Sequence, residues 1–135
     1  MSIQPQPSQS VPTGSDAPVG PAGLWATVDA LSRWLDADQA HGGREGLLLR
    51  VLKLSEEVGE VAQAVIGVTG QNPRKGVSHT WDDVQSELCD VVITALVALR
   101  TLTPEAEAVF AGHLARVAER SLEGAGDPPA QAPAP

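Results

Sequence analysis

The chain has 135 residues, a formal net charge of −8 and one cysteine. The excess of acidic residues excludes electrostatic binding of nucleic acid as the main activity, because contacts to a phosphate backbone need clustered lysine and arginine. The single cysteine, Cys89, excludes an intrachain disulfide and a metal site built from cysteine alone.

The chain begins and ends with segments rich in proline, glycine and other small residues. Residues 1–23 and 123–135 contain too little apolar surface to offset the entropy that ordering them would cost. We predict that both are disordered tails and that residues 24–122 form one helical domain. A folded part of this size has a small core, which self-association would enlarge.

Apolar residues at helical spacing predict four helices in this domain and no strand. The predicted helices cover residues 24–39, 45–66, 81–102 and 104–122. Pro104 suits the first position of the last helix, because its fixed φ is helical and its missing N–H would have no partner there. The expected fold is therefore all-α, a bundle of four helices.

The boundaries between these helices carry their own signals. Gly42 and Gly43 end the first helix. Thr80 followed by Asp83 resembles a capping box at the start of the third helix. The segment 67–80 contains three glycines and a proline, so it cannot continue a helix, and its length favours a functional loop.

No segment approaches the length of a membrane-spanning helix, since the apolar run 91–99 is too short. The first residues lack the basic start and the long apolar run of a signal peptide. We therefore expect a cytoplasmic protein with no membrane partner.

Two short stretches carry paired carboxylates. Glu57 and Glu60 are three residues apart on the second predicted helix, and Glu87 and Asp90 are three apart on the third. Residues at this spacing project from one side of a helix. Each pair therefore presents two acids in the same direction.

The two pairs also share a register. If Val58 and Leu88 are taken as the centres of the apolar stripes, one acid precedes each centre by one residue and the other follows it by two. Antiparallel packing of the two helices through these stripes would bring all four carboxylates together beside the core. An isolated pair of this kind usually lies on a solvated helix face, but two pairs in matching register favour a shared site.

Clustered carboxylates repel one another and are costly to desolvate, and a divalent cation removes that cost. The expected ligands are all oxygen, which selects Mg²⁺, or Mn²⁺, over Zn²⁺. Mg²⁺ shares its coordination shell with water and substrate phosphates. The sequence thus predicts a magnesium site that acts on a phosphoanhydride.

The order of these acids resembles a known motif. Residues 56–60 read EEVGE, residues 61–86 are a spacer, and residues 87–90 read ELCD. This arrangement is similar to the EExxE–spacer–ExxD motif of the MazG-like nucleoside triphosphate pyrophosphohydrolases, in the all-α NTP pyrophosphatase superfamily. The lead-in over residues 52–64 also looks like the helix of that family, and the resemblance spans residues 24–122.

The resemblance implies a helical bundle that dimerises, sometimes as a dimer of dimers. It implies hydrolysis of a (deoxy)nucleoside triphosphate to the monophosphate and pyrophosphate, in a role that clears unwanted nucleotides. By the motif, Mg²⁺ is held by Glu57, Glu60, Glu87 and Asp90. Glu56 is the leading acid of the motif, which could position or deprotonate the attacking water, so Glu56 and Glu57 are the expected catalytic residues.

Six further residues are candidates for binding the substrate: Lys53, Asn72, Arg74, Lys75, Trp81 and Thr94.

Several of these six have alternative interpretations. Lys53 could neutralise a phosphate or pair with the neighbouring glutamates. Arg74 and Lys75 could close over a triphosphate or lie in a solvated loop. Trp81 could stack on a base, whereas Thr94 is small where some relatives carry a ring, which leaves the base preference open.

Other interpretations of the chain remain open. A catalytically weak or silent relative, acting as a nucleotide-binding or regulatory dimer, would share the same fold. A di-iron carboxylate bundle is disfavoured, because neither acid pair is Glu-x-x-His. Trp25 and Trp34 are expected in the core or at a subunit interface. Gly59 costs about 1 kcal/mol in a helix, which suggests a close approach there.

Overall fold

The computed structural model describes residues 21–38 and 40–122. These residues form four helices and no strand, which confirms the all-α prediction. The helices are α1 (Pro21–Asp38), α2 (Gly43–Thr69), α3 (Trp81–Leu102) and α4 (Ala106–Leu122). The predicted tails lie outside the described residues, except for residues 21–23. These three belong to α1, so the predicted end of the first tail is wrong there; proline suits the first position of a helix.

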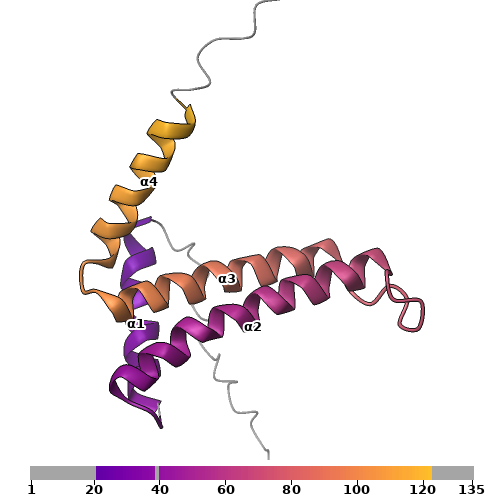
Figure 1. Cartoon of the computed structure of the whole chain (residues 1–135), viewed down its shortest axis with the longest axis horizontal. Coiled ribbons are helices and arrows are strands. Elements are labelled where there is room, and N and C mark those ends of the chain that lie inside the picture. Colours follow the sequence, from indigo (N-terminus) through magenta and orange to yellow (C-terminus); the bar gives the residue numbers. More distant parts are fainter. Residues whose placement is uncertain (1–20, 39, 123–135) are drawn as a thin grey trace, which may run out of the picture.

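Helices α2 and α3 form a long antiparallel hairpin (Figure 1). Helix α1 crosses the end of the hairpin where α2 begins and α3 ends, and α4 leaves that same end and runs away from the hairpin. Trp25 of α1 and Phe110 of α4 meet edge to face, with 6.1 Å between the ring centroids. Because α1 crosses the hairpin and α4 runs away from it, the four helices do not close into one compact bundle within the described residues.

The predicted capping box of α3 is confirmed. The Thr80 hydroxyl accepts a hydrogen bond from the backbone N–H of Asp83, and the Asp83 carboxylate accepts one from the N–H of Thr80. The hydrogen bonds that the Asp83 carboxylate accepts from the backbone N–H and the hydroxyl of Thr80 hold the pKa of Asp83 below its usual value. The last helix begins at Ala106, two residues later than predicted, because the Thr103 hydroxyl accepts the Glu105 N–H in a turn before it.

The apolar core is small and lies where α1 crosses α3. Val28 of α1 packs there with Leu96 and Val97 of α3, and all three side chains are buried. Trp25, Leu31 and Leu35 of α1 surround this cluster and are partly buried. The main attachment of α1 is thus to the second half of α3.

The residues predicted as the centres of the buried apolar stripes of α2 and α3 are wrong. Val58 is 56% exposed and Leu88 is 50% exposed. The buried residues of α2 are instead Gly46, Glu57, Ala64 and Gly67.

The reason lies in the composition of α2. Its first half, residues 43–54, carries leucine and valine over a wide arc of the helix, so periodicity alone does not decide which part of that arc faces α3. Small residues let two helices approach closely. The side of α2 that is buried carries Gly46, Ala64 and Gly67 beside Glu57. The bulky side chains are left on the outside.

The far end of the hairpin depends on a glycine. A Cβ added to Gly67 would lie 2.1 Å from Nδ1 of His79 and 2.8 Å from the Ser78 hydroxyl. The Gly67 carbonyl also accepts the Ser78 N–H at 3.0 Å. No atom of the described residues lies within 4 Å of a Cβ added to Gly59, so these residues do not make the close approach expected there.

These two glycines of α2 make a matched pair for mutagenesis. We expect Gly67→Ala to destabilise the fold by about 1–3 kcal/mol, because the His79 ring and the Ser78 hydroxyl must move. Gly59→Ala should stabilise it by up to about 1 kcal/mol, because alanine has the higher helix propensity. Chemical denaturation followed by circular dichroism measures both, and equal effects of the two substitutions would contradict the packing described.

Candidate functional site

Three carboxylates meet in the middle of the hairpin. Glu57 of α2 and Glu87 and Asp90 of α3 each offer an oxygen, and these oxygens lie within 4.8 Å of one another. Glu57 is only 7% exposed, Glu87 is half-buried and Asp90 is exposed. The structure therefore brings together three of the four carboxylates that the sequence predicted as ligands, and we call them the acidic triad.

Lys53 lies one helical turn before Glu57 and contacts two acids. Its Nζ atom is 2.9 Å from Oε1 of Glu57 and 2.9 Å from Oε2 of Glu56. Hydrogen bonds to Glu56 and to Glu57 raise the pKa of Lys53 above its usual value. Of the two interpretations of Lys53, pairing with the glutamates is the one seen in this structure. Glu56 itself is exposed and lies outside the acidic triad.

Glu60, the fourth predicted ligand, lies outside the acidic triad but close to it. Desolvation raises the pKa of Glu60, and the charges of Glu57 and Glu87 raise it further. Neighbouring carboxylates thus disfavour its ionised form. A cation bound between them would relieve this repulsion.

The acidic triad fits a hard divalent cation. Its donors are carboxylate oxygens only, and neither histidine nor cysteine joins the cluster among the described residues. Cys89 lies between two of the acids in sequence but is exposed. Mg²⁺ binds six oxygens and accepts water and phosphate at positions that the protein leaves open. Three carboxylates would leave such positions free.

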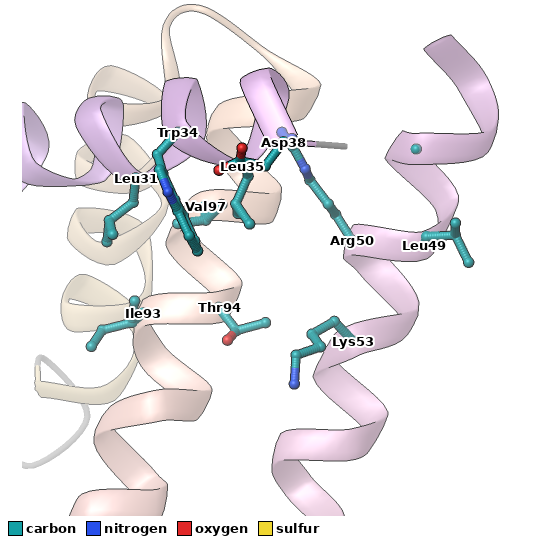
Figure 2. A pocket seen from close by; sticks show the side chains of 11 residues that line it. Leu31, Trp34, Leu35, Asp38, Leu49, Arg50, Lys53, Ile93, Thr94 and Val97 are labelled. Atoms are coloured by element: carbon teal, nitrogen blue, oxygen red, sulfur yellow. The ribbon is translucent and has the colours of Figure 1, made fainter. Parts of the chain in front are cut away.

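A pocket of about 360 Å³ lies beside the acidic triad, between α1, α2 and α3 (Figure 2). Most of its lining is apolar. Figure 2 shows Lys53 of α2 and Thr94 of α3 pointing toward one another across the pocket, with the Trp34 ring of α1 above them. The lining residues are Leu31, Trp34, Leu35, Asp38, Gly46, Leu49, Arg50, Lys53, Ile93, Thr94 and Val97.

Two residues connect this pocket to the acidic triad. Lys53 lines the pocket and also binds Glu57. Thr94 lines the pocket and follows Asp90 by one helical turn. Lys53 and Thr94 are therefore the predicted substrate-binding residues that the structure places beside the acids.

The other four predicted substrate-binding residues lie elsewhere in the chain. Asn72, Arg74 and Lys75 belong to the connection between α2 and α3, at the far end of the hairpin (Figure 1). The end of α2 lies about 18 Å beyond the acids along the helix axis, by the rise of an α-helix. The Asn72 side chain accepts the Arg74 N–H at 3.0 Å, as a turn former does. Trp81 is 61% exposed and does not line the pocket.

Sequence reasoning missed part of the pocket. Trp34 was expected in the core or at an interface, but it is 61% exposed and lines the pocket. Leu31, Arg50 and Ile93 were not singled out as candidate binding residues and line it too. Trp25, in contrast, packs against the core as expected. No signal in the sequence gives the angle at which α1 crosses the hairpin, and this angle decides which ring reaches the pocket.

Comparison with protein-family models, with curated proteins and with solved structures gives no significant match. The resemblance to MazG-like enzymes therefore rests on the acidic motif. None of the described helices is long and apolar enough to cross a membrane.

Cation binding at the acidic triad is open to a direct test. We expect Mg²⁺ or Mn²⁺ to raise the melting temperature, because a ligand that binds only the folded state stabilises it by about 2.7 kcal/mol at 100 times its Kd. Glu57→Gln should remove most of this effect, since it replaces the buried carboxylate. Thermal melts with and without chelator measure it. The control is Glu107→Gln on α4, which removes an equal charge far from the acids; a shift of equal size in both variants would contradict the assignment.

Proposed function

We propose that this protein is a magnesium-dependent nucleoside triphosphate pyrophosphohydrolase, which converts a (deoxy)nucleoside triphosphate to the monophosphate and pyrophosphate. The observation that carries the proposal is an acidic triad that Lys53 and Thr94 connect, over one helical turn, to an apolar pocket. The pocket has a volume of about 360 Å³, which falls in the range of small-molecule sites. The MazG-like order of the acids supports the same reaction.

The proposed orientation of the substrate follows from the different chemistry of the apolar pocket and the acidic triad. The base occupies the apolar pocket, against Trp34, Leu31 and Ile93. The triphosphate extends past Lys53 toward the acidic triad, which repels phosphate unless a cation is bound. Mg²⁺ held there by Glu57, Glu87 and Asp90 would neutralise phosphate oxygens and acidify a bound water.

Water attacks the α-phosphorus in the proposed reaction. The new P–O bond forms as the bond from the α-phosphorus to the bridging oxygen breaks, and pyrophosphate leaves. We assign the positioning or deprotonation of this water to Glu56, whose carboxylate is exposed and held by Lys53. Glu60, with its raised pKa, lies on the same side and would join the metal ligands once a cation offsets the repulsion.

The weakest part of the pocket is base recognition. Among the described residues of its lining, Thr94 offers the one uncharged hydroxyl, the Trp34 indole offers one N–H, and no side chain carries an amide. Discrimination between bases relies on buried hydrogen-bonding groups that the wrong base leaves unpaired. We therefore expect modest selectivity among bases, which suits removal of varied unwanted nucleotides from the cytoplasmic pool.

We also propose that the chain acts as a homodimer or as a dimer of dimers. Many large apolar side chains on the outside of the hairpin are more than a third exposed, and an exposed apolar surface of this kind marks an interaction site. They are Leu48, Val51, Leu52, Val58, Val65, Ile66, Leu88 and Val92. Asn72, Arg74, Lys75 and Trp81 could then reach a substrate only from a second copy.

Self-association through the hairpin can be tested at Val92, which is 57% exposed. We expect Val92→Asp to shift the protein toward monomer, because it places a charge within the apolar surface. Gln63→Glu, at an exposed polar position of α2, is the control and should leave association unchanged. Sedimentation velocity measures both. A wild-type protein that stays monomeric at every concentration would refute the dimer.

Hydrolysis can be tested by pyrophosphate release from the eight standard (d)NTPs and their oxidised and deaminated analogues. We expect activity with Mg²⁺ or Mn²⁺ and none in excess chelator. Glu57→Gln should lower the rate by about 100-fold or more, which corresponds to about 3 kcal/mol of lost charge stabilisation. Glu107→Gln should keep full activity.

Two outcomes would reject the proposed reaction. Turnover by Glu57→Gln at the wild-type rate would show that the acidic triad is not the site. Binding of nucleotide by the wild type without any turnover would leave the alternative function, a catalytically silent nucleotide-binding or regulatory module.

A further inference from the structure

A second cavity lies on the other side of α1 from the apolar pocket. It has a volume of about 300 Å³ and forms where α1 crosses the end of the hairpin. Its lining is polar, and we call it the arginine cavity. The lining residues are Asp29, Ser32, Arg33, Asp36, Arg50, Arg100 and Thr101. We propose that this cavity binds a phosphate-type oxyanion.

The balance of charge in the arginine cavity favours an anion. Three guanidinium groups face two carboxylates, so the lining carries an excess of positive charge in a chain of net charge −8. Arginine keeps its charge at any physiological pH, and its fork of N–H donors matches the oxygens of phosphate. The acidic triad, in contrast, repels phosphate when no cation is bound. The arginine cavity is therefore the better place in the metal-free chain for a free oxyanion.

Two of the arginines are held in place by the carboxylates. Arg50 donates to Asp36 at 2.7 Å and to the Thr101 hydroxyl at 2.9 Å, and its side chain is 9% exposed. Arg100 donates through Nε to Asp29. These pairs connect α1 to α2 and to α3. They fix the guanidinium groups at the edge of the cavity, as pre-organised binding sites require.

Donors remain for a ligand after these pairs are counted. The Nη2 group of Arg100 makes no hydrogen bond to the described residues. Arg33 is exposed and forms no ion pair within them, although Asp29 and Asp36 lie one turn away on either side. Ser32 is 8% exposed, lines the cavity, and its hydroxyl has no hydrogen-bond partner among the same residues.

A tetrahedral oxyanion would use these donors together. Two arginines and a hydroxyl around one phosphate give charge-assisted hydrogen bonds, which are about twice as strong as neutral ones. Thr101 is not free to add another donor, because its hydroxyl already donates to the Val97 carbonyl at 2.9 Å. The expected ligand contacts are thus Ser32, Arg33 and Arg100. Arg50 also lines the cavity and adds positive charge while it is bonded to Asp36 and Thr101.

Arg50 gives the arginine cavity a connection to the apolar pocket, because it lines both. An oxyanion in one cavity would attract the same guanidinium that borders the other. The phosphate could be free, as orthophosphate or pyrophosphate, or part of a nucleotide. The shared chemistry is the phosphate group, and a binding experiment separates these sources.

The test is titration calorimetry of the full chain in excess chelator, with orthophosphate, pyrophosphate and a nucleoside monophosphate at constant ionic strength. We expect saturable binding at one site per chain, and the tightest of the three ligands identifies the source. Arg33→Gln should weaken binding about 10-fold, which corresponds to about 1.4 kcal/mol, the order of one charge-assisted hydrogen bond. Ser32→Ala, a smaller change that removes the serine hydroxyl from the lining, should weaken it as well.

The matched control is Arg44→Gln, which removes the same charge from an exposed arginine in the first turn of α2 that does not line the cavity. Its binding should equal that of the wild type. The proposal is overturned if the wild type binds none of the three ligands. It is also overturned if Arg33→Gln and Arg44→Gln weaken binding equally, which would indicate general charge attraction. No cation or turnover enters this measurement, so its result is independent of the proposed hydrolysis.

Discussion

A carboxylate buried between two helices faces two others across the interface, and a single lysine neutralises part of its charge. Glu57 occupies this position because α2 packs on α3 through an arc of small residues. Buried like charges are costly unless something of opposite charge compensates them. The hairpin therefore retains an electrostatic penalty at its centre, and a hard cation is the simplest way to remove it. Desolvation and the charges of the same cluster raise the pKa of Glu60.

Helix α1 shapes the rest of the site. Its apolar residues rest on α3, while its charged residues pair with Arg50 and Arg100. Because α1 crosses the hairpin instead of lying along it, a cavity forms on each of its sides. One is mainly apolar and adjoins the acidic triad, and the other is lined by arginines. The same helix thus separates an apolar cavity from a polar one, and Arg50 lines both.

Local features of this fold could be predicted from the sequence, and features set by tertiary packing could not. The four helices and the capping box at Thr80 follow from spacing and side-chain chemistry, and so does the meeting of Glu57 with the two acids of α3. The register argument reached that meeting through Val58 and Leu88, which are in fact exposed. Where a helix is apolar on several sides, periodicity does not select the buried one. The role of Trp34 depends on a crossing angle that no local pattern encodes.

Cys89 has a practical consequence. It is exposed, it is the only cysteine in the chain, and it lies on α3 between two members of the acidic triad in sequence. A fluorophore or nitroxide attached to this thiol would occupy one defined place on every molecule. Such a probe would sit within a helical turn of Glu87 and Asp90. Its emission or its magnetic relaxation would then report the arrival of a paramagnetic ion such as Mn²⁺ without altering any of the three carboxylates.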